Sequence, residues 1–178
     1  MEAYALTDIG QVRSMNQDYI YSSPERVGSL PNLFLVADGM GGHQAGDYAS
    51  RFAVENLVIY LNREGKGSPV MQLKTGIGIV NGLLYEESLL REELKGMGCT
   101  LVAGVVEDNL LYVANVGDSR LYLIHNNTIR QITKDHSYVE EMVAMGQMRR
   151  GSADYNSRKN IITRAMGIGR DCLLYTSP

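Results

Sequence analysis

The chain has 178 residues, of which 44% are hydrophobic and 21% charged, as in globular proteins, so an intrinsically disordered chain is excluded. Seventeen Lys and Arg residues against 20 Asp and Glu give a net charge of −3 without a basic patch, which argues against a nucleic-acid partner. No apolar run approaches the ~20 residues that a membrane span needs, and the N-terminus lacks the pattern of a signal peptide. The two cysteines make neither a disulfide framework nor a CxxC metal motif. We therefore expect one soluble, cytoplasmic domain.

The first forty residues are predicted to form short strands joined by polar turns. Residues 2–6 and 19–21 are short strand candidates. Residues 33–37 form a continuous apolar run that has the length of a buried strand.

Two helices are expected to follow these strands. Between residues 45 and 61, alanines and leucines recur every four residues, which places them on one helical face. Ser68 is a candidate N-cap for a second helix, because Pro69 after it suits the first helical position. We expect that helix to run to Gly96, since glycine commonly ends helices.

The middle of the chain is predicted to be two consecutive hairpins. Their turns contain Asp and Asn, which are favoured in such turns. The expected strand pairs are 100–106 with 110–116 and 120–124 with 128–132. A third helix is expected over 137–145, and residues 147–160 are polar, as in an exposed flap. Hairpins without intervening helices are antiparallel, so the predicted class is α+β.

Three aspartates stand at the ends of predicted strands, and two of them adjoin a glycine. Asp18 opens the second strand candidate, Asp38 closes the apolar run and Asp118 follows the first hairpin. Carboxylates that converge repel one another unless a cation lies between them. An all-oxygen ligand set favours Mg²⁺ or Mn²⁺ over Zn²⁺. The alternative for each aspartate is that it only ends its strand in a turn.

A glycine-rich loop starts at Asp38 and reads Asp38-Gly39-Met40-Gly41-Gly42-His43. Its glycines let the backbone approach a ligand or a metal closely. It is neither a P-loop nor a dinucleotide fingerprint, and it lacks the alternating ligands of an EF-hand. Arg13 precedes Asp18 by five residues, and its planar guanidinium suits a phosphate. An exposed arginine that pairs with a nearby carboxylate is the alternative.

Taken together, these segments resemble the metal-dependent serine/threonine protein phosphatases of the PPM type, also called type 2C, in their bacterial form. The matching segments are Thr7-Asp8-Ile9-Gly10 through Arg13, Asn16-Gln17-Asp18, Val36-Ala37-Asp38-Gly39-Met40-Gly41-Gly42-His43, Gly98-Cys99-Thr100-Leu101, Asn115-Val116-Gly117-Asp118-Ser119-Arg120, Thr133-Lys134-Asp135-His136-Ser137 and Ile162-Thr163-Arg164-Ala165-Met166-Gly167. The resemblance implies a four-layer α-β-β-α sandwich of two antiparallel sheets flanked by helices.

The resemblance also implies a set of metal ligands for two, or three, Mn²⁺ or Mg²⁺ ions. Asp38 would bridge two ions, and the carbonyl of Gly39 together with Asp18 would complete the second site, partly through water. Asp118 would bind a third, weaker ion.

The catalytic roles that the resemblance implies fall on Arg13 and His43. Arg13 would bind the substrate phosphate, while a hydroxide that bridges two ions attacks phosphorus in line. His43 is a candidate for protonating the leaving alkoxide, or else a loop residue that packs on the start of a helix. The expected substrates are proteins phosphorylated on Ser or Thr, including a cognate kinase, and the family precedent is monomeric.

The sequence departs from the family pattern after Asp171. Family members continue with a further Asp-Gly motif and a closing Asp-Asn motif, and neither is present here. We expect residues 1–171 to be an incomplete phosphatase domain that lacks the C-terminal strands and helix, and 172–178 to be a non-native tail. Such a chain is expected to be inactive or unstable, with exposed sheet edges and apolar surface.

Two other classes of function remain open from the sequence. One is a non-catalytic, phosphatase-like binding module, although such a module has no physical need for intact Asp18, Asp38, Asp118 and Arg13. The other is a domain that a structural Mg²⁺ or Ca²⁺ ion stabilises. Only the enzyme requires that a phosphate-like anion and the cation strengthen each other's binding.

Overall fold

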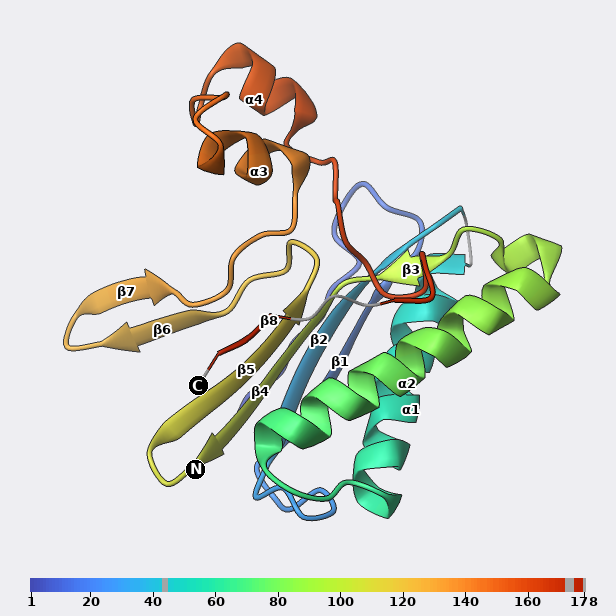
Figure 1. The fold of residues 1–178 in the computed structure, drawn as a ribbon, viewed down its shortest axis with the longest axis vertical. Helices are drawn as coiled ribbons and strands as arrows, with labels where there is room; N and C mark the ends of the chain where they lie inside the picture. The colour runs from blue at the N-terminus through green and yellow to red at the C-terminus, as the bar shows by residue number, and fades with distance from the viewer. Residues whose placement is uncertain (43–44, 172–174, 178) are drawn as a thin grey trace.

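The main sheet of the protein is antiparallel and carries the predicted site at one end. The computed structural model describes residues 1–42, 45–171 and 175–177. Among these residues the sheet follows the order β1-β2-β4-β5-β8, and β3 pairs with β2 (Figure 1). The strands are β1 (Asp18–Ser23), β2 (Leu33–Met40), β3 (Gly98–Cys99), β4 (Leu101–Glu107), β5 (Leu110–Val116) and β8 (Tyr175–Ser177).

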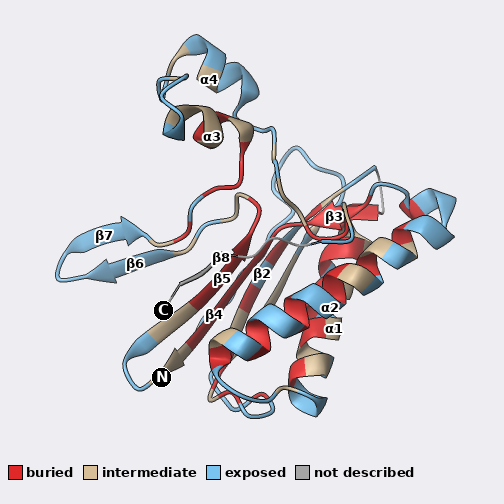
Figure 2. Cartoon of the chain, in the orientation of Figure 1, coloured by how far each residue is buried: buried red, intermediate tan, exposed pale blue. Residues whose placement is uncertain are grey.

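Two long helices, α1 (Ala45–Arg63) and α2 (Pro69–Leu90), pack against one face of this sheet (Figure 1). The predicted stripe of α1 is confirmed, because its alanines and leucines are buried. These side chains meet the alternate residues of β2 that point toward the helices, such as Leu35, and together they form the hydrophobic core (Figure 2). The core therefore fixes the strands whose ends carry the site.

The start of α2 is as predicted, and its end is not. The hydroxyl of Ser68 accepts a hydrogen bond of 3.4 Å from the N–H of Met71, so Ser68 is the N-cap. The expected end at Gly96 is wrong, since α2 stops at Leu90 and is followed by the short 3-10 helix η1 (Glu92–Leu94). The backbone becomes extended at Arg91, with φ −128° and ψ 120°. This change of direction brings Leu94 into the core.

The turns of both predicted hairpins contain consecutive residues with positive φ. In the first hairpin these are Asp108 and Asn109, at 49° and 63°. In the second they are Asn126 and Asn127, at 47° and 58°. Asp and Asn tolerate this left-handed conformation better than other non-glycine residues, and two such residues in a row make the type I′ turn of tight hairpins. The local sequence therefore determined these two connections.

The predicted strand at residues 2–6 is wrong. Among the described residues this segment pairs with no strand, and Tyr4 is 92% exposed. A short run of apolar residues forms a strand only where a neighbouring strand satisfies the backbone and a core covers one face. Residues 2–6 have neither.

The second antiparallel sheet is the hairpin of β6 (Tyr122–His125) and β7 (Thr128–Gln131), which extends beside the main sheet (Figure 1). Beyond it lie α3 (Tyr138–Ala144) and α4 (Ala153–Arg158). The helix α3 confirms the prediction for 137–145, whereas α4 falls inside the segment that was expected to be only a polar flap. Antiparallel sheets with packed helices confirm the α+β class and the expected type of architecture.

The face of the main sheet opposite α1 and α2 is partly open to solvent. On that face, the side chain of Val36 is 47% exposed.

Candidate active site

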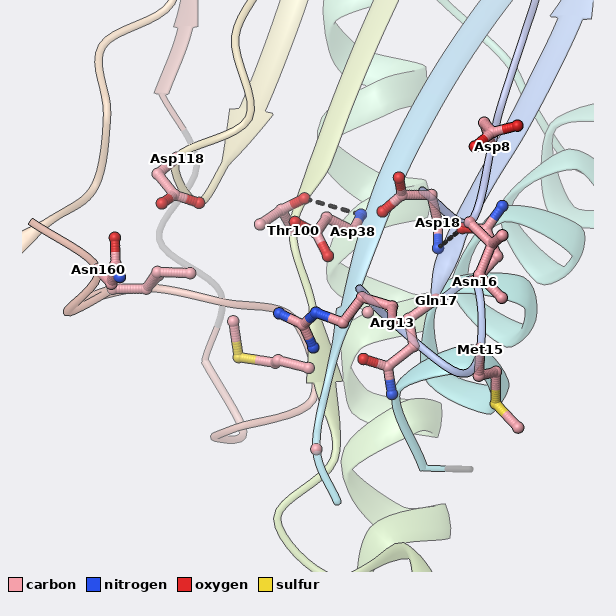
Figure 3. A pocket seen from close by; sticks show the side chains of 15 residues that line it. Asp8, Arg13, Met15, Asn16, Gln17, Asp18, Asp38, Thr100, Asp118 and Asn160 are labelled. Carbon is pink, nitrogen blue, oxygen red and sulfur yellow. Dashed lines mark hydrogen bonds between the residues drawn. The ribbon is translucent and has the colours of Figure 1, made fainter. Parts of the chain in front are cut away.

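The register of the main sheet brings the predicted aspartates to one end of it. Asp18, the first residue of β1, lies directly opposite Asp38 near the end of β2. Directly opposed residues of an antiparallel pair point to the same face, so these two carboxylates are neighbours. Asp118 follows the end of β5 and approaches from the other side. Figure 3 shows Asp38 between Asp18 and Asp118.

These side chains line an open pocket of about 580 Å³. Five of the six predicted site residues belong to its wall: Arg13, Asp18, Asp38, Gly39 and Asp118. The sixth, His43, lies outside the described residues. The wall also includes Thr100 and Asn160, which the sequence analysis did not assign to the site (Figure 3). Thr100 belongs to the matched segment Gly98–Leu101, so its position in that motif was the one available signal for it.

In the pocket, the negative charge of the carboxylates exceeds the positive charge of the nearby Arg13. Desolvation by the surrounding protein raises the pKa of Asp38 even though its side chain reaches solvent. The charges of Asp18 and Asp118 and a hydrogen bond with Asp18 raise it further, and Arg13 acts weakly in the opposite direction. Partial burial is also the main cause that raises the pKa of Asp118. A cation between these groups would relieve this repulsion.

The donor set of the pocket fits a hard divalent cation. Carboxylate and backbone oxygens, with room for water, are the ligands that Mg²⁺ and Mn²⁺ prefer. Within the residues that the structure describes, no three His, Cys, Asp or Glu side chains are grouped closely enough to hold one ion. The neighbouring pair Asp18 and Asp38 therefore offers one partial site and Asp118 another, each of which needs further oxygen ligands.

Gly39 occupies a position where the backbone of two other segments approaches it. A Cβ atom at Gly39 would lie 1.9 Å from the carbonyl oxygen of Gly46 in α1 and 2.8 Å from that of Gln17. The N–H of Gly39 donates to the Gln17 carbonyl over 2.9 Å, and the hydroxyl of Ser50 donates to the same oxygen over 2.7 Å. The loop after Asp38 is thus fixed against α1 and against the segment that leads into Asp18.

The loop that carries Arg13 is held by short polar contacts at its ends. The carboxylate of Asp8 accepts a hydrogen bond of 2.7 Å from the N–H of Gly10, which lies in the turn at φ 73°. The Oδ1 atom of Asn16 accepts a hydrogen bond of 3.0 Å from the N–H of Asp18, and its Nδ2 atom donates one of 2.8 Å to the hydroxyl of Thr7. These contacts explain the Thr, Asp and Gly of the first matched segment and the Asn of the second. They direct Arg13 toward the pocket (Figure 3).

Comparison with known proteins identifies the class. The family "Protein phosphatase 2C" matches residues 10–142. The serine/threonine phosphatase stp of Listeria welshimeri is 39% identical over 176 residues, which cover 94% of this chain and 68% of that protein. The chain belongs to the protein phosphatase 2C family, whose members are metal-dependent protein phosphatases.

Solved structures agree with this assignment. The crystal structure of the serine/threonine phosphatase Stp1 from Staphylococcus aureus superposes with a TM-score of 0.86 at 35% identity, over 96% of this chain and 68% of that one. The catalytic domain of the phosphatase PstP, solved in complex with two manganese ions, gives a TM-score of 0.75 at 30% identity, over 94% and 68% of the two chains. In the part of this chain that the structure describes, none of the helices is both long and apolar enough to cross a bilayer.

Proposed function

We propose that the pocket serves the metal-dependent hydrolysis of phosphoserine and phosphothreonine in proteins, with Mn²⁺ or Mg²⁺ as the cation. The observation that supports this most directly is the position of Asp38 between Asp18 and Asp118 in a pocket that Arg13 also lines. Phosphate hydrolysis needs cations at the attacked group and a positive side chain on its oxygens. The pocket offers ligands for the first and Arg13 for the second.

The proposed ligands divide between the two sides of Asp38. Asp18 and the carbonyl of Gly39 would hold one ion together with Asp38, and Asp118 would hold a further ion on the other side. When bound, such ions lower the pKa of a coordinated water, so that hydroxide is available near neutral pH, and they neutralise charge on the phosphoryl oxygens. The relative that was solved with two manganese ions supports this choice of cation.

Arg13 is proposed to orient the phosphate of the substrate. A guanidinium offers two parallel N–H donors to a phosphate, which fixes the direction of the phosphoryl group. The hydrogen bonds that Asp8 and Asn16 make at the two ends of the loop limit the motion of Arg13. His43 stays a prediction as the proton donor to the leaving alkoxide.

The names of the relatives support phosphoproteins as the substrates, since both the Listeria and the Staphylococcus proteins are serine/threonine phosphatases. We further propose that a serine/threonine kinase of the same cell is among these substrates. A monomer in the cytoplasm is the proposed state of the protein.

The test is whether a phosphate analogue and the cation bind cooperatively. Vanadate binding is measured by calorimetry with and without Mn²⁺, in the original chain, in Asp38→Asn and in Asp154→Asn. Asp154 lies in α4 and its side chain is 57% exposed, so it is a matched control for the loss of one carboxylate. We expect Mn²⁺ to tighten vanadate binding by at least about fivefold in the original chain and the control, and not in Asp38→Asn. Equal affinity with and without Mn²⁺ would favour a binding module or a structural metal site instead.

A further inference from the structure

Thr100 lies at the centre of the site, between the two sets of proposed ligands. It precedes β4 and is fully buried. Its hydroxyl oxygen accepts the N–H of Asp38 over 3.0 Å, and its own N–H donates to the carbonyl of Asp38 over 2.9 Å (Figure 3). Both backbone groups of Asp38 are therefore held by one residue, which does not itself present a charged ligand.

The same side chain contacts the turn that carries Asp118. The hydroxyl oxygens of Thr100 and Ser119 are 2.6 Å apart. On its other side the methyl group of Thr100 fills the space beside Gly117, where an added Cβ would lie 2.6 Å from that methyl carbon. Thr100 therefore contacts residues on both sides of Asp118.

The hydroxyl groups of Thr100 and Ser119 can form a hydrogen-bonded bridge between Asp38 and the turn that carries Asp118. A threonine hydroxyl can donate one hydrogen and accept at its lone pairs. Because the Thr100 oxygen already accepts the N–H of Asp38, its contact with Ser119 links Asp38 and the Asp118 turn through a continuous series of hydrogen bonds. Such buried series are rigid when every member has its partner.

We propose that Thr100 and Ser119 are positioning residues whose hydroxyl bridge fixes the distance between the carboxylates of Asp38 and Asp118, and thereby sets cation affinity on both sides of Asp38. This inference rests on the proposed function, because it concerns the same cation site. Asp38 and Asp118 repel each other, so without a rigid link the metal-free site relaxes apart, and binding must first bring it together. Residues that orient metal ligands typically change affinity by 10- to 100-fold when they are removed.

The test measures Mn²⁺ affinity directly, from the electron paramagnetic resonance signal of free Mn²⁺. Thr100→Val keeps the shape of the side chain and removes the hydroxyl, Thr100→Ser keeps the hydroxyl, and Ser119→Ala removes the bridge from the other end. The matched control is Thr133→Val, because Thr133 is also buried and its hydroxyl accepts a backbone N–H, that of Leu121, outside this bridge.

We expect Thr100→Val to weaken Mn²⁺ binding at least about tenfold, while Thr100→Ser and Thr133→Val stay within about threefold of the original chain. Unchanged affinity in Thr100→Val, or an equal loss in Thr100→Ser, overturns the proposal, since the hydroxyl is then not responsible. If Thr100→Val does not fold, Ser119→Ala decides: weaker binding supports the bridge and unchanged binding overturns it. Failure of the original chain to bind Mn²⁺ contradicts the proposed function itself, which is a distinguishable result.

Discussion

The side chain of Asn81, in the middle of α2, holds the backbone of Gly167. Its Oδ1 accepts the N–H of Gly167 over 2.9 Å, and its Nδ2 donates to the carbonyls of Gly169 and Arg170 over 2.9 and 3.0 Å. Asn81 is 1% exposed, so these bonds lie in the interior. One amide therefore attaches residues 167–170 to a helix that is distant in sequence, and the packed structure extends at least to Arg170.

Asn81→Ala is expected to lower the free energy of unfolding by about 2 to 3 kcal/mol, because it leaves the buried N–H of Gly167 without its acceptor. Urea unfolding followed by circular dichroism measures the difference. Asn62→Ala is the matched control, since Asn62 makes similar side-chain to backbone bonds, to Gly28 and Val58, at an exposed position. Equal losses in the two variants would show that the burial of Asn81 has no special importance.

Gly39→Ala is expected to cost about 3 kcal/mol or to prevent folding, because its Cβ would collide with the backbone of α1. Backbone atoms cannot move aside as the end of a flexible side chain does, so Asp38 would be displaced with them. Gly42→Ala in the same loop is the control, since an added Cβ there meets nothing within 4 Å. Thermal unfolding of both variants tests this, and similar midpoints would contradict the expectation.

Asp38→Asn is expected to have opposite effects with and without metal. In the metal-free protein it removes a desolvated charge that Asp18 and Asp118 repel, so stability should rise, by about 0.5 kcal/mol at most because solvent screens the group. With Mn²⁺ the variant should lose the stabilisation that metal binding gives the original chain. Thermal midpoints at several Mn²⁺ concentrations separate the two effects. A variant that Mn²⁺ stabilises as strongly as the original chain would remove Asp38 from the ligand set.

Two residues of the flap, Arg150 and Tyr155, contact a carboxylate of α3 whose titration should be shifted to lower pH. Arg150 donates hydrogen bonds to Glu140 of α3, and the hydroxyl of Tyr155 in α4 donates to it over 2.9 Å. The pKa of Glu140 is lowered from its ordinary 4.5, first by Arg150 and then, against the effect of burial, by Tyr155. A lowered pKa means that this contribution to stability is complete above pH 4.5 and is lost as the pH falls through the lowered value.

An NMR titration of the Glu140 carboxyl group is expected to give a midpoint below 4.5. Arg150→Ala should raise that midpoint, whereas Arg149→Ala, which removes the neighbouring cation, should leave it nearly unchanged. A midpoint at or above 4.5 in the original chain would show that the pair does not stabilise the flap at neutral pH.

The sequence predicted most of the fold because local patterns specify it. The stripe of α1, the cap at Ser68 and the Asp and Asn residues of the turns each act within a few residues of their position. Residues 2–6 and the end of α2 were mispredicted because they depend on distant partners. A strand needs a neighbouring strand, and the chain leaves α2 at Arg91 so that Leu94 reaches the core.

In the candidate site, too, the residues with a local sequence signal were predicted and those that depend on distant partners were not. Asp18, Asp38 and Asp118 were recognisable from their positions at strand ends, and the structure brings them into one pocket. Thr100 was not assigned a role, because its importance depends on contacts with Asp38 and Ser119, which are 62 and 19 residues away in sequence. Apart from its place in the matched segment Gly98–Leu101, the neutral side chain of Thr100 carries no signal of such contacts. The helix α4 was missed because its polar sequence lacks an apolar stripe, and its N-cap Ser152 lies within the same polar segment.

The pairing of Asp18 with Asp38 also makes the chemistry depend on strand alignment. Side chains alternate between the two faces of a sheet, so a slip of one residue between β1 and β2 would turn Asp18 to the opposite face. A single-residue insertion inside either strand is therefore expected to abolish the proposed cation binding while every proposed ligand residue remains in the sequence. An insertion of the same size in the connection at residues 24–32 can be absorbed without such a slip. For an insertion or deletion in this protein, we therefore expect the effect on activity to depend on whether it falls inside β1 or β2. The distance between the change and the aspartates is expected to matter less.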